Sequence, residues 1–108
     1  AWDASEMACR IAGQCEPVVP AGMNNKDLGR RDRYSIMALY AAEKAVADSG
    51  IDIDKEDPTR CGVCVGTGIG GIETMQDNVT AFATKGPRRV SPFAVPKCLA
   101  NMATGEIA

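Results

Sequence analysis

The 108-residue chain contains no histidine and few aromatic residues. Without histidine, a Ser/His or Cys/His catalytic pair cannot be built from this chain alone. A zinc site would have only cysteines and carboxylates to draw on. Aromatic residues make up 5% of the sequence, so the core has to rely on Ala, Val, Ile, Leu and Met.

Long hydrophobic runs and a strong excess of one charge are also missing. No apolar run approaches the roughly 20 residues of a membrane span, and no charged-then-apolar signal segment opens the chain. A net charge of −2 argues against a nucleic-acid surface. We therefore expect neither membrane nor nucleic acid as a partner. The length of 108 residues predicts one small domain, residues 1–108, with no internal boundary.

Cysteine is present in an odd number, which with no secretory signal favours free thiols in a reducing compartment. Two of the five cysteines form a C-x-x-C pair, Cys61 and Cys64. The pair lies in an apolar run and has no second C-x-x-C to complete a metal site. We expect buried small hydrophobes rather than redox or metal ligands. The five are Cys9, Cys15, Cys61, Cys64 and Cys98.

Three helices are predicted from apolar residues at three- and four-residue intervals. The clearest spans Asp32 to Ser49, with Asp32 as a cap or first-turn acid and Gly50 as a left-handed stop. Its apolar face is wide and rich in alanine, which indicates close packing on a neighbour. A second helix is expected from Ile72 to Thr84, after which 85–96 is a proline-punctuated loop. A third runs from Lys97 through Met102 and Ile107.

A buried strand is predicted for Cys61 to Val65, because a continuous apolar run is typical of a parallel strand covered on both faces. Residues 7–13 alternate loosely and predict a short strand. Residues 16–25 are expected to be a loop, and residues 52–59 a charged turn. Helix, strand and helix in this order indicate an α/β layered fold.

A glycine-rich turn, Gly66 to Gly71, satisfies G-x-G-x-x-G between the predicted strand and the second helix. Such a loop can bring backbone N–H groups to a pyrophosphate at a helix N-terminus. The acidic residue expected about 20 positions later is missing, as is the Lys-Ser/Thr of a P-loop. We favour a tight turn in which glycine permits close packing. A small nucleotide-binding domain stays as the alternative.

Several segments occur in the order seen in β-ketoacyl-[acyl-carrier-protein] synthases, and the chain resembles the type II elongating enzymes of fatty-acid synthesis. These segments are Arg30-Arg31-Asp32-Arg33-Tyr34, Asp48-Ser49-Gly50, Val65-Gly66-Thr67-Gly68-Ile69-Gly70-Gly71, Lys85-Gly86-Pro87-Arg88-Arg89-Val90-Ser91-Pro92-Phe93 and Asn101-Met102-Ala103. The resemblance implies part of a thiolase-like α-β-α-β-α layered fold, incomplete in this chain. It also implies a homodimeric parent in the cytoplasm, or in the plastid stroma of a plant.

The resemblance implies an acyltransferase as the parent protein. Such enzymes hold an acyl group on a cysteine thiolate and condense it with malonyl-acyl carrier protein in a decarboxylative Claisen reaction, without metal or redox cofactor. The partners are acyl carrier protein and its acyl and malonyl thioesters. The family's nucleophile, in a Thr-Ala-Cys motif, and its two histidines lie downstream of Asn101-Met102-Ala103. No catalytic residue is therefore transferred, and the 108 residues alone are predicted to be an inactive fragment of the N-terminal half.

One role is carried over from the family. The position matching Leu99 holds an apolar side chain that borders the acyl tunnel, and Phe93, Cys98 and Met102 are its neighbours in sequence. We therefore predict these four residues as acyl-pocket wall and substrate-binding positions. Two alternatives stay open beside this prediction, namely the nucleotide-binding domain and a non-catalytic synthase-derived interaction fragment.

Overall fold

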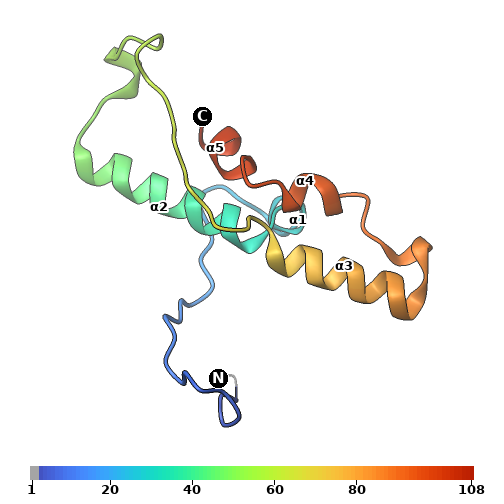
Figure 1. The fold of residues 1–108 in the computed structure, drawn as a ribbon. Helices are drawn as coiled ribbons and strands as arrows, with labels where there is room; N and C mark the ends of the chain where they lie inside the picture. Colours follow the sequence, from blue (N-terminus) through green and yellow to red (C-terminus); the bar gives the residue numbers. More distant parts are fainter. Residues whose placement is uncertain (1–2) are drawn as a thin grey trace.

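The computed structural model describes residues 3–108 and is helical (Figure 1). No β-strand occurs within that range. Residues 3–108 form five α-helices and two short 3₁₀ turns. They are α1 (Asn25–Gly29), α2 (Arg33–Ser49), η1 (Ile53–Lys55), α3 (Ile72–Lys85), η2 (Pro87–Arg89), α4 (Ala94–Cys98) and α5 (Met102–Ile107). None of the helices in the described range is both long and apolar enough to cross a membrane.

Helix α2 confirms the first predicted helix. The Asp32 side chain caps its N-terminus by accepting the Tyr34 N–H at 3.1 Å, which satisfies a donor that has no partner inside the helix. Gly50 ends the helix with φ of 70°, a left-handed conformation that glycine adopts without a Cβ penalty.

Helix α3 confirms the second predicted helix and extends it by one residue to Lys85. From Gly86 the chain reverses through η2, and α4 then packs beside α3 (Figure 1). The Asn78 side chain fixes this return, because its Oδ1 accepts the Ser91 N–H at 2.7 Å while its Nδ2 donates to the Thr74 carbonyl at 2.8 Å. The loop predicted for 85–96 therefore contains η2 and the first turn of α4.

The prediction of one continuous third helix is wrong, because the structure has two short helices, α4 and α5, in this region. Helix α4 starts at Ala94, earlier than the predicted start at Lys97. Pro96 is tolerated there because it lies in the first turn, where a backbone N–H would have no partner inside the helix. It ends at Cys98; Leu99 is extended, with φ of −66° and ψ of 127°. The carbonyls of Cys98 and Leu99 accept bonds from Gly71 and Tyr34. These contacts, remote in sequence, stop a continuous helix, and α5 begins only at Met102.

The predicted strand Cys61–Val65 is not formed, and neither is the strand predicted for 7–13. A strand needs a neighbour to pair its N–H and C=O groups, and residues 3–108 supply none. Cys61 and Cys64 are consequently exposed, so the prediction that they are buried is also wrong. One polar contact holds the segment's end, where the Val65 N–H donates to the Thr104 hydroxyl at 3.3 Å.

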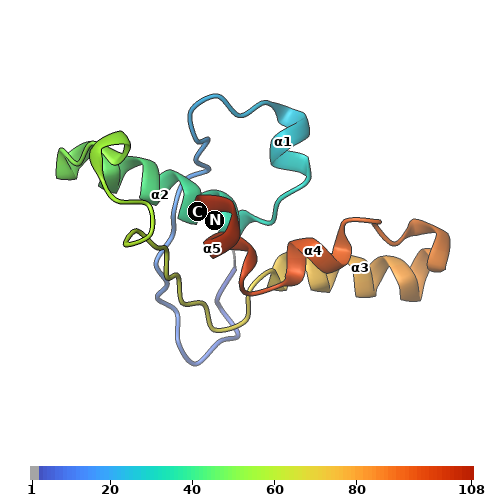
Figure 2. The ribbon, with the colours of Figure 1, turned by 90° about the horizontal axis from the view of Figure 1, so that it is seen from above.

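The buried centre lies where α2 and α3 begin and where α5 packs on α2 (Figure 2). From this centre α2 and α3 extend to opposite sides of the molecule (Figure 1). The centre is small and partly polar. Ala103 is completely buried, and the exposed fractions of Asp32, Ser35 and Thr74 are 5%, 2% and 6%.

Candidate functional site

The linker between α4 and α5, residues 99–101, is the point at which the elements of the chain converge. The Tyr34 hydroxyl, from the first turn of α2, donates to the Leu99 carbonyl. The Met102 N–H donates to the same carbonyl at 3.1 Å. On the other side, the Gly71 N–H donates to the Cys98 carbonyl at 3.2 Å. Two successive carbonyls are thus held by residues far away in the sequence.

Gly70 and Gly71 press directly on this linker. Gly70 has φ of 77°, and a Cβ there would lie 2.6 Å from the Cys98 carbonyl oxygen. A Cβ on Gly71 would lie 2.2 Å from the Lys97 carbonyl oxygen. Side chains cannot be placed at such distances, so both positions require glycine. The tight turn favoured from the sequence is confirmed here, although a strand does not precede it.

Asp32 occupies the N-terminus of α3 as well as that of α2. Its Oδ2 accepts the Thr74 N–H at 3.0 Å, and its Oδ1 accepts the Tyr34 N–H. A nucleotide-binding loop uses such a helix N-terminus for the negative charge of a phosphate. Here a buried carboxylate of the chain itself takes that place. The nucleotide-binding alternative therefore finds no support in the geometry.

The four predicted wall residues fall into two groups. Cys98, Leu99 and Met102 meet at the junction of α4 and α5, where Cys98 ends α4 and Met102 opens α5. Phe93 lies at the other end of α4, with the Arg30 guanidinium 5.7 Å from its ring centroid. The exposed fractions of Leu99 and Phe93 are 46% and 41%, so both offer apolar surface.

A polar hollow runs between α3 and the returning chain. Its lining combines cationic groups with hydroxyl, amide and carboxylate groups. The residues are Thr74, Asp77, Asn78, Ala81, Arg89, Ser91 and Lys97. The Lys97 ammonium also donates to the Gly29 carbonyl at 3.4 Å. None of the four predicted wall residues lines this hollow.

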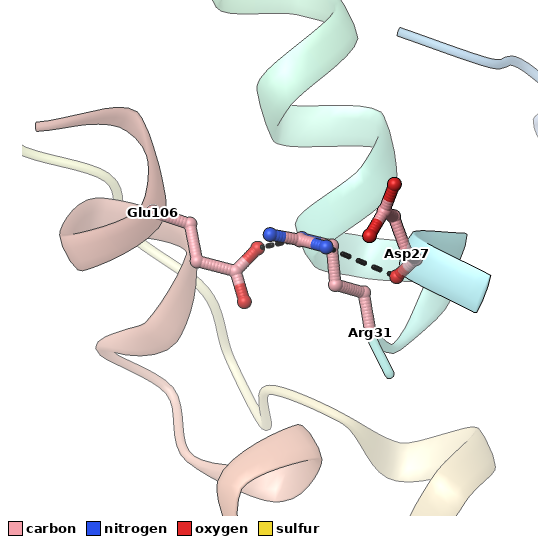
Figure 3. Close-up of polar contacts among 3 residues, drawn as sticks. All are labelled: Asp27, Arg31 and Glu106. Atoms are coloured by element: carbon pink, nitrogen blue, oxygen red, sulfur yellow. Dashed lines mark hydrogen bonds and ion pairs between the residues drawn. The ribbon is translucent and has the colours of Figure 1, made fainter. Parts of the chain in front are cut away.

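Arg31 joins the start of α2 to α5, as Figure 3 shows. Its Nε lies 2.7 Å from Glu106 Oε2, and its second guanidinium nitrogen donates to the Asp27 carbonyl at 3.0 Å. The two charged side chains are 26% and 16% exposed, so solvent screens this pair less than a fully exposed one. The pair holds α5, and with it the linker, against α2.

Sequence reasoning missed Tyr34 and the second role of Asp32. Tyr34 and Leu99 are 65 residues apart, and Asp32 and Thr74 are 42 apart. No local spacing encodes such contacts. The one feature of the sequence that pointed to these two residues is the run Arg30-Arg31-Asp32-Arg33-Tyr34, which belongs to the family resemblance. Within residues 3–108 no group of three or more His, Cys, Asp or Glu is placed to hold a metal ion, and all five cysteines are free thiols.

Comparison with known proteins identifies the family. The model of the β-ketoacyl synthase N-terminal domain matches residues 7–108. The chain belongs to this family. Among its relatives is the 3-oxoacyl-[acyl-carrier-protein] synthase 2 of Synechocystis, 37% identical over 105 residues, which are 96% of this chain and 25% of the relative. The enzyme of the same name from Staphylococcus aureus is 38% identical over 106 residues, 97% of this chain and 26% of the relative.

A solved structure of a β-ketoacyl synthase relative supports the fold. It is a type II polyketide acyl carrier protein in complex with its ketosynthase, and it matches with a TM-score of 0.70 and 29% identity over 80% of this chain and 25% of that chain. The predicted fold class, part of a thiolase-like α/β fold, is thereby confirmed. The chain spans about a quarter of the length of the relatives it matches.

Proposed function

We propose that this chain is a segment of a 3-oxoacyl-[acyl-carrier-protein] synthase. The parent enzyme would condense an enzyme-bound acyl thioester with malonyl-acyl carrier protein, releasing carbon dioxide. The observation that carries the proposal is the family match over residues 7–108. The relatives named as 3-oxoacyl-[acyl-carrier-protein] synthases, at 37% and 38% identity, support it.

Within that enzyme, the segment supplies scaffold and part of the acyl-pocket wall. Leu99, with Phe93, Cys98 and Met102, forms the wall in this proposal. Its support is the combination found at Leu99, a main chain fixed by two hydrogen bonds and a half-exposed apolar side chain. Binding pockets for apolar ligands are typically lined by such side chains on a largely preformed frame.

The chemistry itself would reside outside these residues. The chain has no histidine, and none of its cysteines lies in the family's Thr-Ala-Cys motif. We therefore propose that residues 1–108 alone are inactive and that the nucleophile and the two histidines come from the rest of the parent.

Acyl carrier protein is the proposed partner. The solved relative is described as an acyl carrier protein in complex with its ketosynthase. We further propose a homodimeric parent in the cytoplasm, or in the stroma if the source is a plastid. The free thiols of all five cysteines fit a reducing compartment.

The coding sequence downstream of Ala108 tests the proposal first. A Thr-Ala-Cys motif followed by two histidines, and condensation of an acyl thioester with malonyl-acyl carrier protein by the encoded polypeptide, are the expected results. A stop codon after Ala108 would contradict the proposal that the chain is part of an enzyme. The product would then be a non-catalytic protein whose exposed faces bind a partner.

Substitution of Leu99 tests the wall. In the full-length enzyme Leu99→Phe should lower kcat/KM for long acyl chains at least about tenfold relative to short ones, because the larger ring fills space that the chain needs. Val95→Phe is the control, since Val95 lies on the preceding helix α4, is 69% exposed and is not a predicted wall residue. Equal selectivity in both variants would exclude Leu99 from the wall.

A further inference from the structure

The main chain at Leu99 is fixed more firmly than its place in a short linker would suggest. Its carbonyl accepts two hydrogen bonds, one from the Met102 N–H at 3.1 Å and one from the Tyr34 hydroxyl. The first is local and belongs to the turn that leads into α5. The second comes from another helix, so it ties the Leu99 carbonyl directly to α2.

Tyr34 reaches Leu99 from a rigid base. It lies in the first turn of α2, where its N–H is held by Asp32 Oδ1 at 3.1 Å. The second oxygen of Asp32 holds the Thr74 N–H of α3, and Asp32 is 5% exposed. Because tyrosine has only two side-chain torsions, little rotational freedom is lost in aiming its hydroxyl. The base, the ring and the Leu99 carbonyl thus form one connected frame.

We infer that Tyr34 is a positioning residue that sets how far the Leu99 side chain projects, and hence which acyl lengths the enzyme prefers. This rests on the proposed function, in which Leu99 borders the acyl chain. Without the hydroxyl, the Leu99 carbonyl would keep only its local bond to Met102. The linker could then shift relative to α2, and the 46%-exposed side chain of Leu99 would move with it.

The test compares three forms of the full-length enzyme: wild type, Tyr34→Phe and Tyr40→Phe. Tyr40 is the matched control, because it lies on the same helix and its ring is 4.9 Å from the Lys44 ammonium, with no part at Leu99. The readout is kcat/KM for short, medium and long saturated acyl thioesters. Loss of one hydrogen bond predicts a change of about three- to tenfold in the long-to-short ratio for Tyr34→Phe, and none for Tyr40→Phe.

A double-mutant cycle separates positioning from general stabilisation. In a Leu99→Ala background, Tyr34→Phe should leave the long-to-short ratio unchanged, because the side chain to be positioned is gone. Equal loss of kcat on every chain length, an unchanged ratio, or failure of Tyr34→Phe to fold would each overturn the inference while the proposed function stands. A wild-type enzyme unable to condense any acyl thioester would instead overturn the proposed function, and the inference with it.

Discussion

At the scale of single residues, Asp32 joins the starts of two helices. Each of its carboxylate oxygens accepts one backbone N–H, from Tyr34 at the start of α2 and from Thr74 at the start of α3. A negative charge is favourable at both helix N-termini. Because the side chain is 5% exposed, water could not readily replace it for the two N–H groups.

Asp32→Ala should therefore lower the free energy of unfolding by about 2–3 kcal/mol, since a cap is lost at one helix and a buried donor is left unpaired at the other. Chemical denaturation of the full-length protein measures this. Asp48→Ala, at the exposed end of α2, is the control and should cost less than about 0.5 kcal/mol. Equal costs would mean that the double cap contributes nothing.

Glu43 gives a residue-scale prediction about pH. The Ala21 N–H donates to Glu43 Oε2 at 2.8 Å, and this bond, followed by the Lys44 ammonium, lowers the pKa of the carboxyl below its ordinary value of 4.5. The stabilisation is therefore fully present above pH 4.5 and is lost as the pH falls through the lower folded-state pKa.

The amide proton of Ala21 should report this titration in NMR spectra of the full-length protein. Its chemical shift is expected to move upfield in acid as the bond to Glu43 is lost, with a midpoint below 4.5. In Glu43→Gln the shift should stay constant over the same range. A midpoint above that value in the wild type would contradict the assignment.

At the scale of elements, the Gly70–Gly71 turn determines how closely α3 approaches the linker between α4 and α5. The backbones touch because neither residue has a side chain. The contact explains why the third predicted helix is split. The Gly71 N–H donates to the Cys98 carbonyl at the point where α4 ends. The two glycines therefore determine how closely α3 approaches α4 and where α4 ends.

Gly71→Ala should destabilise the protein by about 2 kcal/mol or more, because its Cβ would lie 2.2 Å from the Lys97 carbonyl oxygen and 3.0 Å from Asp32 Oδ2. Gly68→Ala in the same loop is the matched control, since nothing lies within 4 Å of its Cβ. The control should be neutral or slightly stabilising. Thermal unfolding of the two full-length variants distinguishes them, and similar losses would refute the close-packing argument.

At the scale of the whole molecule, the chain is more expanded than an independent domain of its length. Its radius of gyration is 16.9 Å, whereas about 13 Å is usual for 100 residues. Helix α3 exposes its apolar side along its length, with exposed fractions of 51%, 45%, 63% and 57% for Ile72, Met75, Val79 and Phe82. An unpartnered apolar face of this kind favours association.

The isolated 108 residues should therefore self-associate or bind a hydrophobic dye, as measured by ultracentrifugation and dye fluorescence. Phe82→Lys should reduce both signals, because it places a charge in the apolar face. Gln76→Lys, at an exposed polar position of α3, should leave them unchanged. A monomeric, cooperative thermal transition in the wild-type chain would contradict this expectation.

The sequence predicted what local periodicity and caps determine. Helices α2 and α3 follow from apolar spacing, and Asp32 and Gly50 mark the ends of α2 as expected. The strand at Cys61–Val65 failed because strand formation depends on a partner, which residues 3–108 do not contain. For the candidate site, the family resemblance implied Leu99 and its neighbours as wall residues, which stays a prediction. The anchors of Leu99 were not predictable, because they come from residues distant in sequence.

The double cap at Asp32 also has a consequence for the order of folding during synthesis. Asp32 leaves the ribosome 42 residues before Thr74 and Arg31 leaves it 75 residues before Glu106. One carboxylate oxygen can cap α2 as soon as that helix emerges, while the other has no partner until α3 has been made. During synthesis the N-terminal part of a chain emerges first and can begin to fold first. We therefore expect α2 to form first, with the Asp32 carboxylate at its N-terminus. Helix α3 and then α5 would join it as they are made.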